Sequence, residues 1–397
     1  MENMNIFTPA VASMKASAIR EIFKLIGQKD IISLAAGIPA PELFPAKEWS
    51  KITEDILTNN AKTALVYGVT EGYAPLREIT KERMEKIGAF SPETDELIIT
   101  SGAQQAIDLS AKVLLNVGDG VIVEKPSFIG SLNSFRSYGA VLYGADNEED
   151  GINVNQVEEL LKKHKNIKLI YTIPTFQNPS GTTMSLEKRK KLLDLAEKYD
   201  VYIIEDNPYG ELRFKGEEVK TIKSMDKNGR VIYAGTYSKT LAPGIRVGFL
   251  SARSDIVDRV VVVKQVNDVN TAVISQMMVT EFIKRYDFDA HIKKCSEVYG
   301  RRCDLMLSLM DEYFPKECTY TRPDGGIFIL CTMPEGTNTN KMLESAIAKK
   351  VAFVPGNTFM IDIDKPSNVF RLNYSVTDEE TIEKGIKLLS EVVKEYI

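Results

Sequence analysis

The chain has 397 residues, and its 50 Lys and Arg against 55 Asp and Glu give a formal net charge of -5. This acidity argues against nucleic-acid binding, and a hydrophobic content of 44% argues against a disordered chain. The length favours two packed domains over one core. Only two histidines occur, His164 and His291, and both are interpreted as solvated helix residues. We therefore expect a different residue type to carry protons in any catalysis.

From about residue 95, short apolar runs alternate with longer amphipathic ones. Six of the runs have the length and composition of buried strands: 97–99, 121–123, 169–171, 201–204, 231–233 and 247–250. Apolar residues at helical spacing predict helices over 104–115 and 186–199, the second with Ser185 as its N-cap. Short buried strands that alternate with helices predict an α/β fold, with a mostly parallel sheet between helices.

The last hundred residues follow a different pattern. A charged amphipathic stretch over 289–314 precedes an apolar run at 325–330, and a helix near 341–350, a strand at 369–374 and a final helix over 378–395 follow. This order predicts a smaller α+β domain at the C-terminus. We expect an N-terminal arm or lid over 1–45 that packs with the small domain, a large domain over 46–286 and a small domain over 287–397.

Cysteine usage and the N-terminus bear on the compartment. The four cysteines form no CxxC pair and no zinc-ligand spacing with a histidine, so we expect free thiols and no metal site: Cys295, Cys303, Cys318 and Cys331. The first residues have no basic or apolar region of a signal peptide, and no run approaches the ~18 apolar residues of a spanning helix. We expect a soluble, cytoplasmic protein that binds no membrane.

Two polar turns follow predicted strands at positions where α/β sheets bind ligands, which is the carboxyl end of each strand. The turn over 100–104 consists of small residues and opens a helix, so its free backbone amides could bind a phosphate or a carboxylate. Such turns are also common without a ligand. The loop over 174–181 contains two prolines and a glycine, which would hold Asn178 rigidly towards a ligand.

Charged residues follow two further strands. Asp206 ends a buried strand, where an acid is costly unless it is paired, although it could also simply cap a turn. Lys239 and Arg246 lie close together after the strand at 231–233. A lysine that is desolvated beside another cation loses pKa and becomes an amine nucleophile. A Walker loop is excluded because Ser238 stands where that motif needs Gly, and no GxGxxG follows a strand.

An anion-binding turn, an Asp, an Asn, a Tyr and a nucleophilic Lys on adjacent strand ends are the groups that pyridoxal phosphate requires. In this combination the sequence resembles the fold-type I pyridoxal-phosphate-dependent aminotransferases of class I/II, and it is most similar to the branch of 2-aminoadipate and kynurenine aminotransferases. The resemblance runs from about Ser17 to the C-terminus, and it rests on these motifs: 33–39, 67–68 with Gly72, 100–105, 177–181, 205–210, 238–240 with Arg246, and 371–374.

The resemblance implies a role for each residue that matches a family motif. Lys239, Asp206 and Tyr209 would be catalytic, with Lys239 bound covalently to the cofactor and Asp206 paired with its pyridine nitrogen. Asn178 and Tyr209 would bind the phenolic oxygen. The phosphate site would comprise Ser101, Gly102, Ala103, Gln104, Thr236, Ser238 and Arg246. Tyr67 would reach the phosphate of the neighbouring subunit, which implies a homodimer with active sites shared across the interface.

The resemblance also implies substrate contacts. Arg371 would bind the α-carboxylate as a two-pronged fork, beside Asn178 and Gly37, although a surface arginine on an edge strand is the alternative. Phe128 would stack on the cofactor ring where many relatives have Tyr. Arg20, at the start of an amphipathic helix in the arm, would meet a distal carboxylate; its alternative is a solvated helix charge.

The activity that the resemblance implies is amino transfer between an L-amino acid (2-aminoadipate, branched-chain, aromatic or similar) and a 2-oxo acid, with 2-oxoglutarate and glutamate as the default pair. Lys239 would move the proton, which would explain the scarcity of histidine. Two alternatives stay open. One is another reaction on the same fold, such as that of a decarboxylase, a β-lyase or an aminocyclopropane-forming synthase. The other, an effector-sensing transcription regulator, is disfavoured because too few residues precede Ile31 for a DNA-binding domain.

Overall fold

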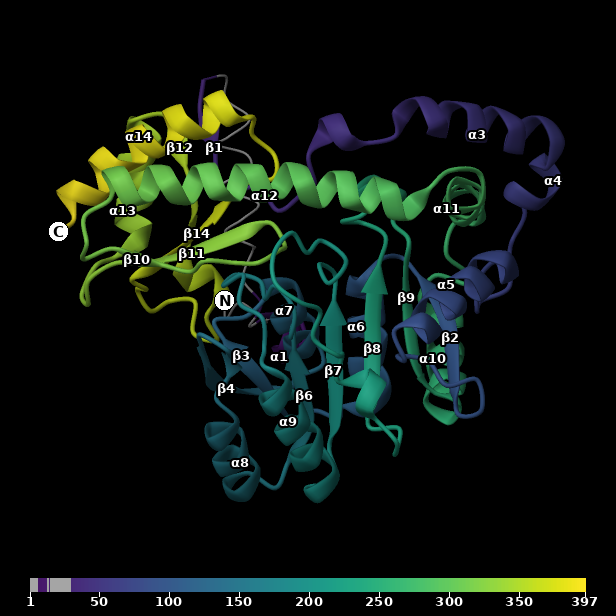
Figure 1. The fold of residues 1–397 in the computed structure, drawn as a ribbon. Coiled ribbons are helices and arrows are strands. Elements are labelled where there is room, and N and C mark those ends of the chain that lie inside the picture. Colours follow the sequence, from purple (N-terminus) through teal and green to yellow (C-terminus); the bar gives the residue numbers. More distant parts are fainter. Residues whose placement is uncertain (1–5, 13, 15–29) are drawn as a thin grey trace.

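The computed structural model describes residues 6–12, 14 and 30–397. An eight-stranded sheet forms its centre, in the order β2-β9-β8-β7-β6-β3-β4-β5 (Figure 1). The strands are β2 (Asp95–Thr100), β3 (Gly120–Lys125), β4 (Val141–Glu148), β5 (Gly151–Ile152), β6 (Ile167–Thr172), β7 (Tyr202–Asn207), β8 (Val231–Thr236) and β9 (Gly248–Arg253). The five strands β8, β7, β6, β3 and β4 are parallel to one another, whereas β9 is antiparallel to β2 and β8, and β5 is antiparallel to β4. The predicted α/β fold with a mostly parallel sheet is confirmed.

Helices cover both faces of this sheet, which explains why its central strands are apolar along nearly their whole length. One face packs against α6 (Ala103–Leu114), α7 (Ile129–Ser137) and α10 (Ser254–Asn267). The other face packs against α8 (Val154–Lys163), α9 (Leu186–Lys198), α3 (Ala46–Asn59), α5 (Ala74–Lys86) and α11 (Val273–Arg285). Two one-turn helices, α1 (Pro9–Ala12) and α4 (Ala61–Ala64), complete this part.

The C-terminal part forms its own core. It contains α12 (Phe288–Tyr313), α13 (Thr339–Ala348) and α14 (Glu379–Glu395), with a four-stranded antiparallel sheet of β10 (Thr319–Tyr320), β11 (Phe328–Thr332), β14 (Val369–Asn373) and β13 (Val354–Pro355). A short strand near the N-terminus, β1 (Ile32–Ser33), pairs in parallel with β12 (Val351–Ala352). Figure 1 shows α12 passing beyond the carboxyl ends of β7 and β8, from α11 to the C-terminal elements.

Several helix ends match the signals in the sequence. The Ser185 side chain accepts a hydrogen bond from the amide of Lys188 and so caps α9, as predicted. Asp378 caps α14 in the same way, by accepting from the amide of Thr381 at 2.8 Å. Each cap satisfies one of the amides that a helix leaves free at its first turn.

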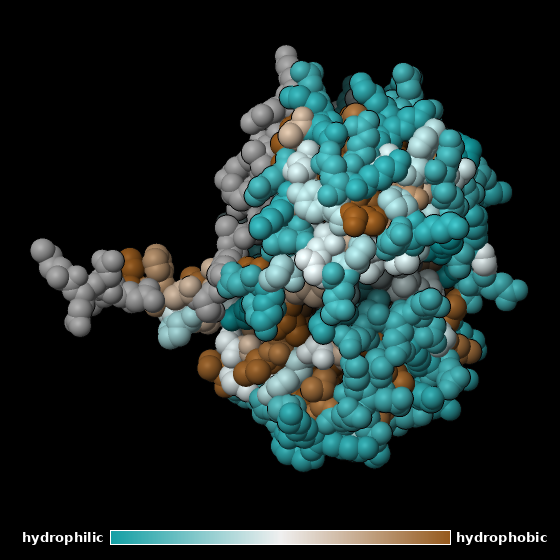
Figure 2. Space-filling view, turned by 90° about the vertical axis from the view of Figure 1, so that its left-hand side faces the viewer, coloured by the Kyte–Doolittle hydropathy of each residue, from teal (hydrophilic) through white to brown (hydrophobic). Residues whose placement is uncertain are grey.

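The outer surface is mainly polar. On the face drawn in Figure 2, hydrophilic side chains predominate, and hydrophobic ones gather in its lower half. Within the described ranges, no helix combines the length and the apolarity that a bilayer-spanning segment requires.

Candidate functional site

The polar turns that the sequence singles out meet at one edge of the large sheet. Because β9 is antiparallel to both of its neighbours, β2 and β8 run in the same direction, and their carboxyl ends flank the start of β9. Gly248 of β9 pairs with both Thr100 and Thr236 at these ends. A Cβ on Gly248 would lie 2.6 Å from the carbonyl carbon of Gly102, so only glycine permits this approach.

Lys239 lies three residues beyond the end of β8 and is half-buried. Its Nζ donates a hydrogen bond to the carbonyl oxygen of Gly37 at 2.7 Å and lies 5.9 Å from the centre of the Tyr209 ring. Burial, followed by the positive charges of Arg371 and Arg246, lowers the pKa of Lys239 to about 8. A large fraction of this amine is therefore unprotonated at mildly alkaline pH, where it can act as a nucleophile or a base.

Asp206, at the end of β7, is buried. Its Oδ2 accepts a hydrogen bond from the Tyr171 hydroxyl at 2.7 Å, whereas its Oδ1 is buried with no hydrogen-bond partner. Burial raises the pKa of Asp206 to about 7, and the Tyr171 hydrogen bond and the charge of Lys239 oppose this rise. An acid with one free, desolvated oxygen is suited to bind a cationic N–H group.

Arg371, on β14, is buried beside the end of the 174–181 loop. Its Nη1 donates to Asn178 Oδ1 and its Nη2 to the carbonyl oxygen of Ala35, both at 2.9 Å. The guanidinium carbon lies 3.9 Å from the centre of the Phe328 ring and 5.0 Å from that of Phe359. Burial lowers the pKa of Arg371 to about 10, which leaves the group charged at neutral pH. These contacts fix the orientation of the guanidinium fork.

A third group of residues surrounds the N-terminus of α6. Gly102 adopts φ +78°, and the Nη2 of Arg246 donates to the carbonyl oxygen of Ser101 at 2.8 Å. Thr236 and Ser238 are linked by a hydrogen bond of 2.9 Å between their hydroxyl groups. The free amides at the start of α6, these hydroxyls and the guanidinium together form an anion-binding set.

Four of the predicted site residues fall outside the three groups described above: Gln104, Phe128, Tyr67 and Arg20. The side chain of Gln104 donates to Gly130 and Ser134 of α7, so only its backbone amide faces the anion-binding set. Phe128 caps α7, with its ring edge close to Gly130. Tyr67 is 86% exposed. Arg20 lies outside the described residues.

The interpretation of the two histidines as solvated residues is wrong for His291. Its Nε2 lies 2.9 Å from the carbonyl oxygen of Thr240, and burial lowers its pKa. His164 terminates α8 and stacks on Tyr143, with ring centres 4.2 Å apart. Aromatic packing, which a single sequence does not reveal, accounts for both placements.

Sequence reasoning missed Tyr171 as the partner of Asp206. A signal was present, because a tyrosine inside a buried strand must find a partner for its hydroxyl group. Tyr171 pairs with Ile204 across β6 and β7, and Asp206 lies two residues further on the same face. The two phenylalanines beside Arg371 were also missed, since they come from segments distant in sequence.

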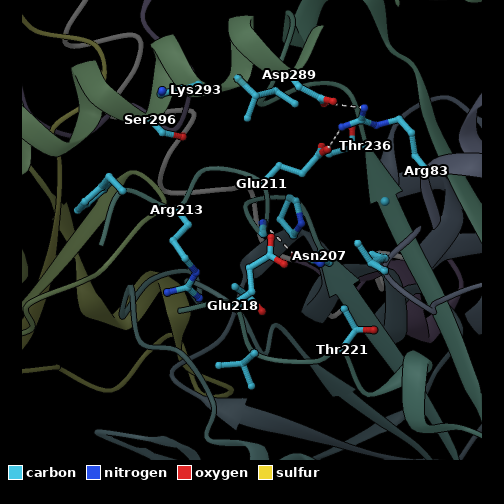
Figure 3. Close-up of a pocket in the computed structure, with 18 of the residues that line it drawn as sticks. Arg83, Asn207, Glu211, Arg213, Glu218, Thr221, Thr236, Asp289, Lys293 and Ser296 are labelled. Atoms are coloured by element: carbon cyan, nitrogen blue, oxygen red, sulfur yellow. Dashed lines mark hydrogen bonds and ion pairs between the residues drawn. The ribbon is translucent and has the colours of Figure 1, made fainter. Parts of the chain in front are cut away.

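A separate cavity of ≈ 1130 Å³ lies between the end of α5, the loop that follows β7, and α12. Figure 3 shows Arg83 between Glu211 and Asp289 at this cavity, with ion pairs of 2.6 and 2.8 Å. Among the predicted site residues that the structure describes, Thr236 alone lines it. The reactive groups Lys239 and Asp206 therefore do not face this cavity. No group of three His, Cys, Asp or Glu within the described ranges could hold a metal ion.

Two solved structures of similar fold are complexes with pyridoxal-type ligands. A kynurenine aminotransferase of Pyrococcus horikoshii, in complex with PMP, is 41% identical, and the match covers 98% of this chain and 97% of that chain with a TM-score of 0.94. LysN, an α-aminoadipate aminotransferase of Thermus thermophilus, is 36% identical over 98% and 97% of the two chains, with a TM-score of 0.90. It is complexed with N-(5'-phosphopyridoxyl)-L-leucine. Both of these ligands are forms of the cofactor pyridoxal phosphate.

The residues present here fit that cofactor. The unpartnered Oδ1 of Asp206 suits a protonated ring nitrogen, the anion-binding set at α6 suits a phosphate, and the Nζ of Lys239 suits an aldehyde. An aromatic-amino-acid aminotransferase of Thermococcus litoralis is 44% identical over 98% of this chain and 94% of its own length. The family model of aminotransferase class I and II matches residues 29–389. The chain is therefore a pyridoxal-phosphate-dependent aminotransferase and belongs to the class I and II family.

Proposed function

We propose that this aminotransferase moves an amino group from an aromatic, branched-chain or 2-aminoadipate-type L-amino acid to a 2-oxo acid, with 2-oxoglutarate as the main acceptor. Relatives named for aromatic amino acids, kynurenine and α-aminoadipate, one of them bound to a leucine adduct, support this range of donors. The observation that carries the proposal is the Nζ of Lys239, an amine of lowered pKa placed close to the carboxylate-binding fork of Arg371.

The proposed roles follow from the chemistry of each group. Asp206 pairs with the pyridine nitrogen, Asn178 and Tyr209 bind the phenolic oxygen, and Phe128 stacks on the ring. The phosphate is bound by the amides of Ala103 and Gln104 and by Thr236, Ser238 and Arg246, with Ser101 and Gly102 forming the turn around it; the Gly102 amide itself donates to the carbonyl oxygen of Thr100 at 2.8 Å. Burial raises the pKa of Tyr209, so its hydroxyl keeps its proton and donates it to an acceptor.

The substrate is oriented by Arg371, whose fork binds the α-carboxylate while Asn178 and the Gly37 backbone form the adjoining wall. Bound pyridoxal phosphate supplies an aldehyde that condenses with amines and a ring that withdraws electrons from the substrate α-carbon. Lys239 Nζ would accept the proton of the substrate α-carbon and deliver it to the carbon that is the aldehyde carbon of the free cofactor. Asp206 stabilises positive charge on the ring nitrogen throughout, and the surrounding apolar groups exclude water.

The experiment for the substrate class is a panel of amino donors measured against 2-oxoglutarate. We expect the highest kcat/KM for aromatic amino acids, leucine or 2-aminoadipate, and low values for aspartate. Arg20→Ala should reduce kcat/KM for 2-aminoadipate more than for leucine, because the proposed role of Arg20 is to bind a distal carboxylate. An equal loss for both donors would refute that role.

Replacing Gly102 with Ala should weaken cofactor binding by about 10- to 100-fold, because the new Cβ would be 2.5 Å from Nη2 of Arg246 and φ is +78°. The dissociation constant of pyridoxal phosphate, measured by fluorescence titration, checks this expectation. Gly118→Ala is the matched control, since Gly118 has φ +88° but an added Cβ meets nothing within 4 Å. Wild-type affinity in the Gly102 variant would contradict the phosphate site.

We also propose that a second copy of the chain covers an exposed apolar surface, here called the α4–α10 patch. It comprises Leu65, Val66, Tyr67, Val69, Val262, Val266 and Val269. The two halves of this patch adjoin, because a Cβ on Gly68 would lie 3.7 Å from Asn270, next to Val269. Exposed apolar patches of this kind mark protein interfaces. Tyr67 from one subunit would then reach the phosphate bound by the other.

Placing a charge in the α4–α10 patch tests this dimer. Val266→Asp should give monomers by light scattering and a loss of at least ~10-fold in activity, because the charge would be buried at the interface. Val117→Asp is the matched control, since Val117 is 86% exposed outside the patch. Tyr67→Phe should keep the dimer and weaken only cofactor binding. A fully active wild-type monomer would contradict the shared site.

The proposal also includes the domain boundaries and the cellular location. The division into an arm (1–45), a large cofactor-binding domain (46–286) and a small domain (287–397) is supported by the separate hydrophobic cores of the two sheets. The pairing of β1 with β12 supports packing of the arm with the small domain. The four free, buried cysteines support a cytoplasmic location, where thiols stay reduced.

A further inference from the structure

The loop that carries Asn178 lies between two buried charged side chains. Glu124, at the carboxyl end of β3, is 1% exposed, and Arg189, in α9, is 0% exposed. Neither forms an ion pair with any residue in the described ranges. Each hydrogen-bonds mainly to polar groups of the 172–184 segment, and Nη1 of Arg189 also donates to the carbonyl oxygen of Lys220 at 3.2 Å. A buried charge is costly unless hydrogen bonds compensate it, so two such residues on one loop require an explanation.

Glu124 binds hydrogen-bond donors on one side of this segment. Its Oε1 accepts from the Thr172 hydroxyl at 2.5 Å and from the amide of Ile173 at 3.2 Å. Its Oε2 accepts from Nε2 of Gln177 at 2.9 Å. The last of these partners is the residue immediately before Asn178.

Arg189 binds hydrogen-bond acceptors of the same segment. Its Nη2 donates to the carbonyl oxygen of Pro174 at 2.7 Å and to the Thr175 hydroxyl at 2.9 Å. Its Nε donates to the carbonyl oxygen of Met184 at 3.0 Å. Both ends of the loop are therefore fastened to one guanidinium group.

The loop between these two anchors has a conformation that would not persist alone. Phe176 is buried and adopts φ +53°, a left-handed conformation that is unfavourable for a residue with a Cβ. The side chain of Gln177 accepts from the amide of Ser180 at 2.8 Å and closes the following turn. The turn presents Oδ1 of Asn178 to Nη1 of Arg371.

We propose that Glu124 and Arg189 are positioning residues that clamp the 172–184 segment and thereby align Asn178 with Arg371 for recognition of the substrate α-carboxylate. Neither residue touches the substrate. Removing either one frees the loop to leave its strained conformation, so Asn178 no longer fixes the guanidinium fork. This inference rests on the proposed substrate role of Arg371.

The test compares donors with and without an α-carboxylate. Wild-type enzyme and Glu124→Leu are each reacted with an L-amino acid and with the amine that has the same side chain but no carboxylate, in single turnovers followed by the cofactor spectrum. We expect kcat/KM for the amino acid to fall about 10- to 100-fold, mainly through KM, and the amine rate to change by less than about threefold. Glu124→Gln should restore most of the selectivity, because its amide can still hydrogen-bond Gln177 and Thr172.

Two further variants keep the result interpretable. Arg189→Lys keeps the charge but cannot reach Pro174, Thr175 and Met184 together, so it should lose selectivity as Glu124→Leu does. Glu205→Leu is the matched control: Glu205 is equally buried, but it accepts from the amides of Ile222 and Lys223 and holds a different turn. It should lower thermal stability without altering the ratio of amino acid to amine.

An equal loss for amino acid and amine in Glu124→Leu and Arg189→Lys would overturn the proposal, because it would indicate a general loss of structure. An unchanged ratio in both folded variants would overturn it as well. A wrong substrate role of Arg371 would give a different result: the wild-type enzyme itself would show no preference for the donor that has a carboxylate.

Discussion

Replacing Lys239 with Ala is expected to abolish amino transfer, with a loss of kcat of about four orders of magnitude or more. Lys239 supplies both the amine that reacts with the cofactor and the base that moves the proton at the substrate α-carbon. Among the described residues, the other cations that act on Lys239 are the guanidinium groups of Arg371 and Arg246, which are not amines and cannot take over this task. Turnover of glutamate formation, measured with a coupled assay, checks the expectation.

The control for this variant is a second buried lysine with a structural role. Lys223 is buried and donates to Asp95 at 2.9 Å, away from the reactive groups. Lys223→Met should lower the melting temperature, because it leaves the buried Asp95 without its ion-pair partner, while kcat stays within about threefold of wild type. Near-wild-type turnover in Lys239→Ala would refute the assignment of the catalytic amine.

The lowered pKa of Lys239 has a consequence for the enzyme without cofactor. Below about pH 8 the amine is charged in the folded and unfolded chains alike, and its desolvation then destabilises the folded state. This penalty disappears as the pH rises from about 8 towards the ordinary lysine pKa, where the unfolded chain also loses the proton. Cofactor-free Lys239→Ala should therefore be more stable than wild type at neutral pH, with a difference that vanishes in alkali.

Replacing Asp206 with Asn should reduce kcat/KM by about 100- to 1000-fold, the second largest effect that we expect. The carboxylate has an unpartnered, buried Oδ1, and an amide there would no longer stabilise positive charge on the ring nitrogen. Tyr171 would still hold the side chain through its hydroxyl group, so the geometry should survive. Steady-state kinetics, together with the spectrum of the bound cofactor, measure the change.

Glu205→Gln separates this electrostatic effect from the loss of a buried acid. Glu205 precedes Asp206 on β7 and is also buried, but its carboxylate accepts from the amides of Ile222 and Lys223. Its replacement should affect stability far more than kcat/KM. Equal losses of kcat/KM in the two variants would contradict the pairing of Asp206 with the ring nitrogen.

Much of the fold follows from local patterns in the sequence. The six apolar runs become β2, β3, β6, β7, β8 and β9, because strands covered on both faces are apolar throughout. Each strand continues beyond the C-terminal end of its predicted run, and β7 and β9 begin one residue later than predicted. The strand β4 was not predicted, since Val141–Glu148 is mostly half-exposed and contains a glycine. The helices α3, α5 and α11 were not predicted either, and their apolar faces are explained only by the sheet that they cover.

The sequence predicts those residues of the site that follow the carboxyl ends of strands. The rule that ligands bind at carboxyl ends of strands brings Lys239, Asp206 and Asn178 together, as the structure does. The identity of their partners was not predictable. A buried tyrosine signals that its hydroxyl needs a partner, but only the strand register, which a single sequence does not reveal, pairs Tyr171 with Asp206 and brings Glu124 to the segment before Asn178. Long-range contacts set pKa values and loop conformation, whereas local composition sets the elements.

The most direct test of the central claim is the reaction of the purified, cofactor-loaded enzyme with one amino acid and no oxo acid. We expect the absorption of bound pyridoxal phosphate to convert to that of pyridoxamine phosphate, with one 2-oxo acid released per subunit and no ammonia or carbon dioxide. Added 2-oxoglutarate should reverse the spectrum. An unchanged spectrum, or release of carbon dioxide or ammonia in place of stoichiometric oxo acid, would contradict amino transfer as the reaction of this site.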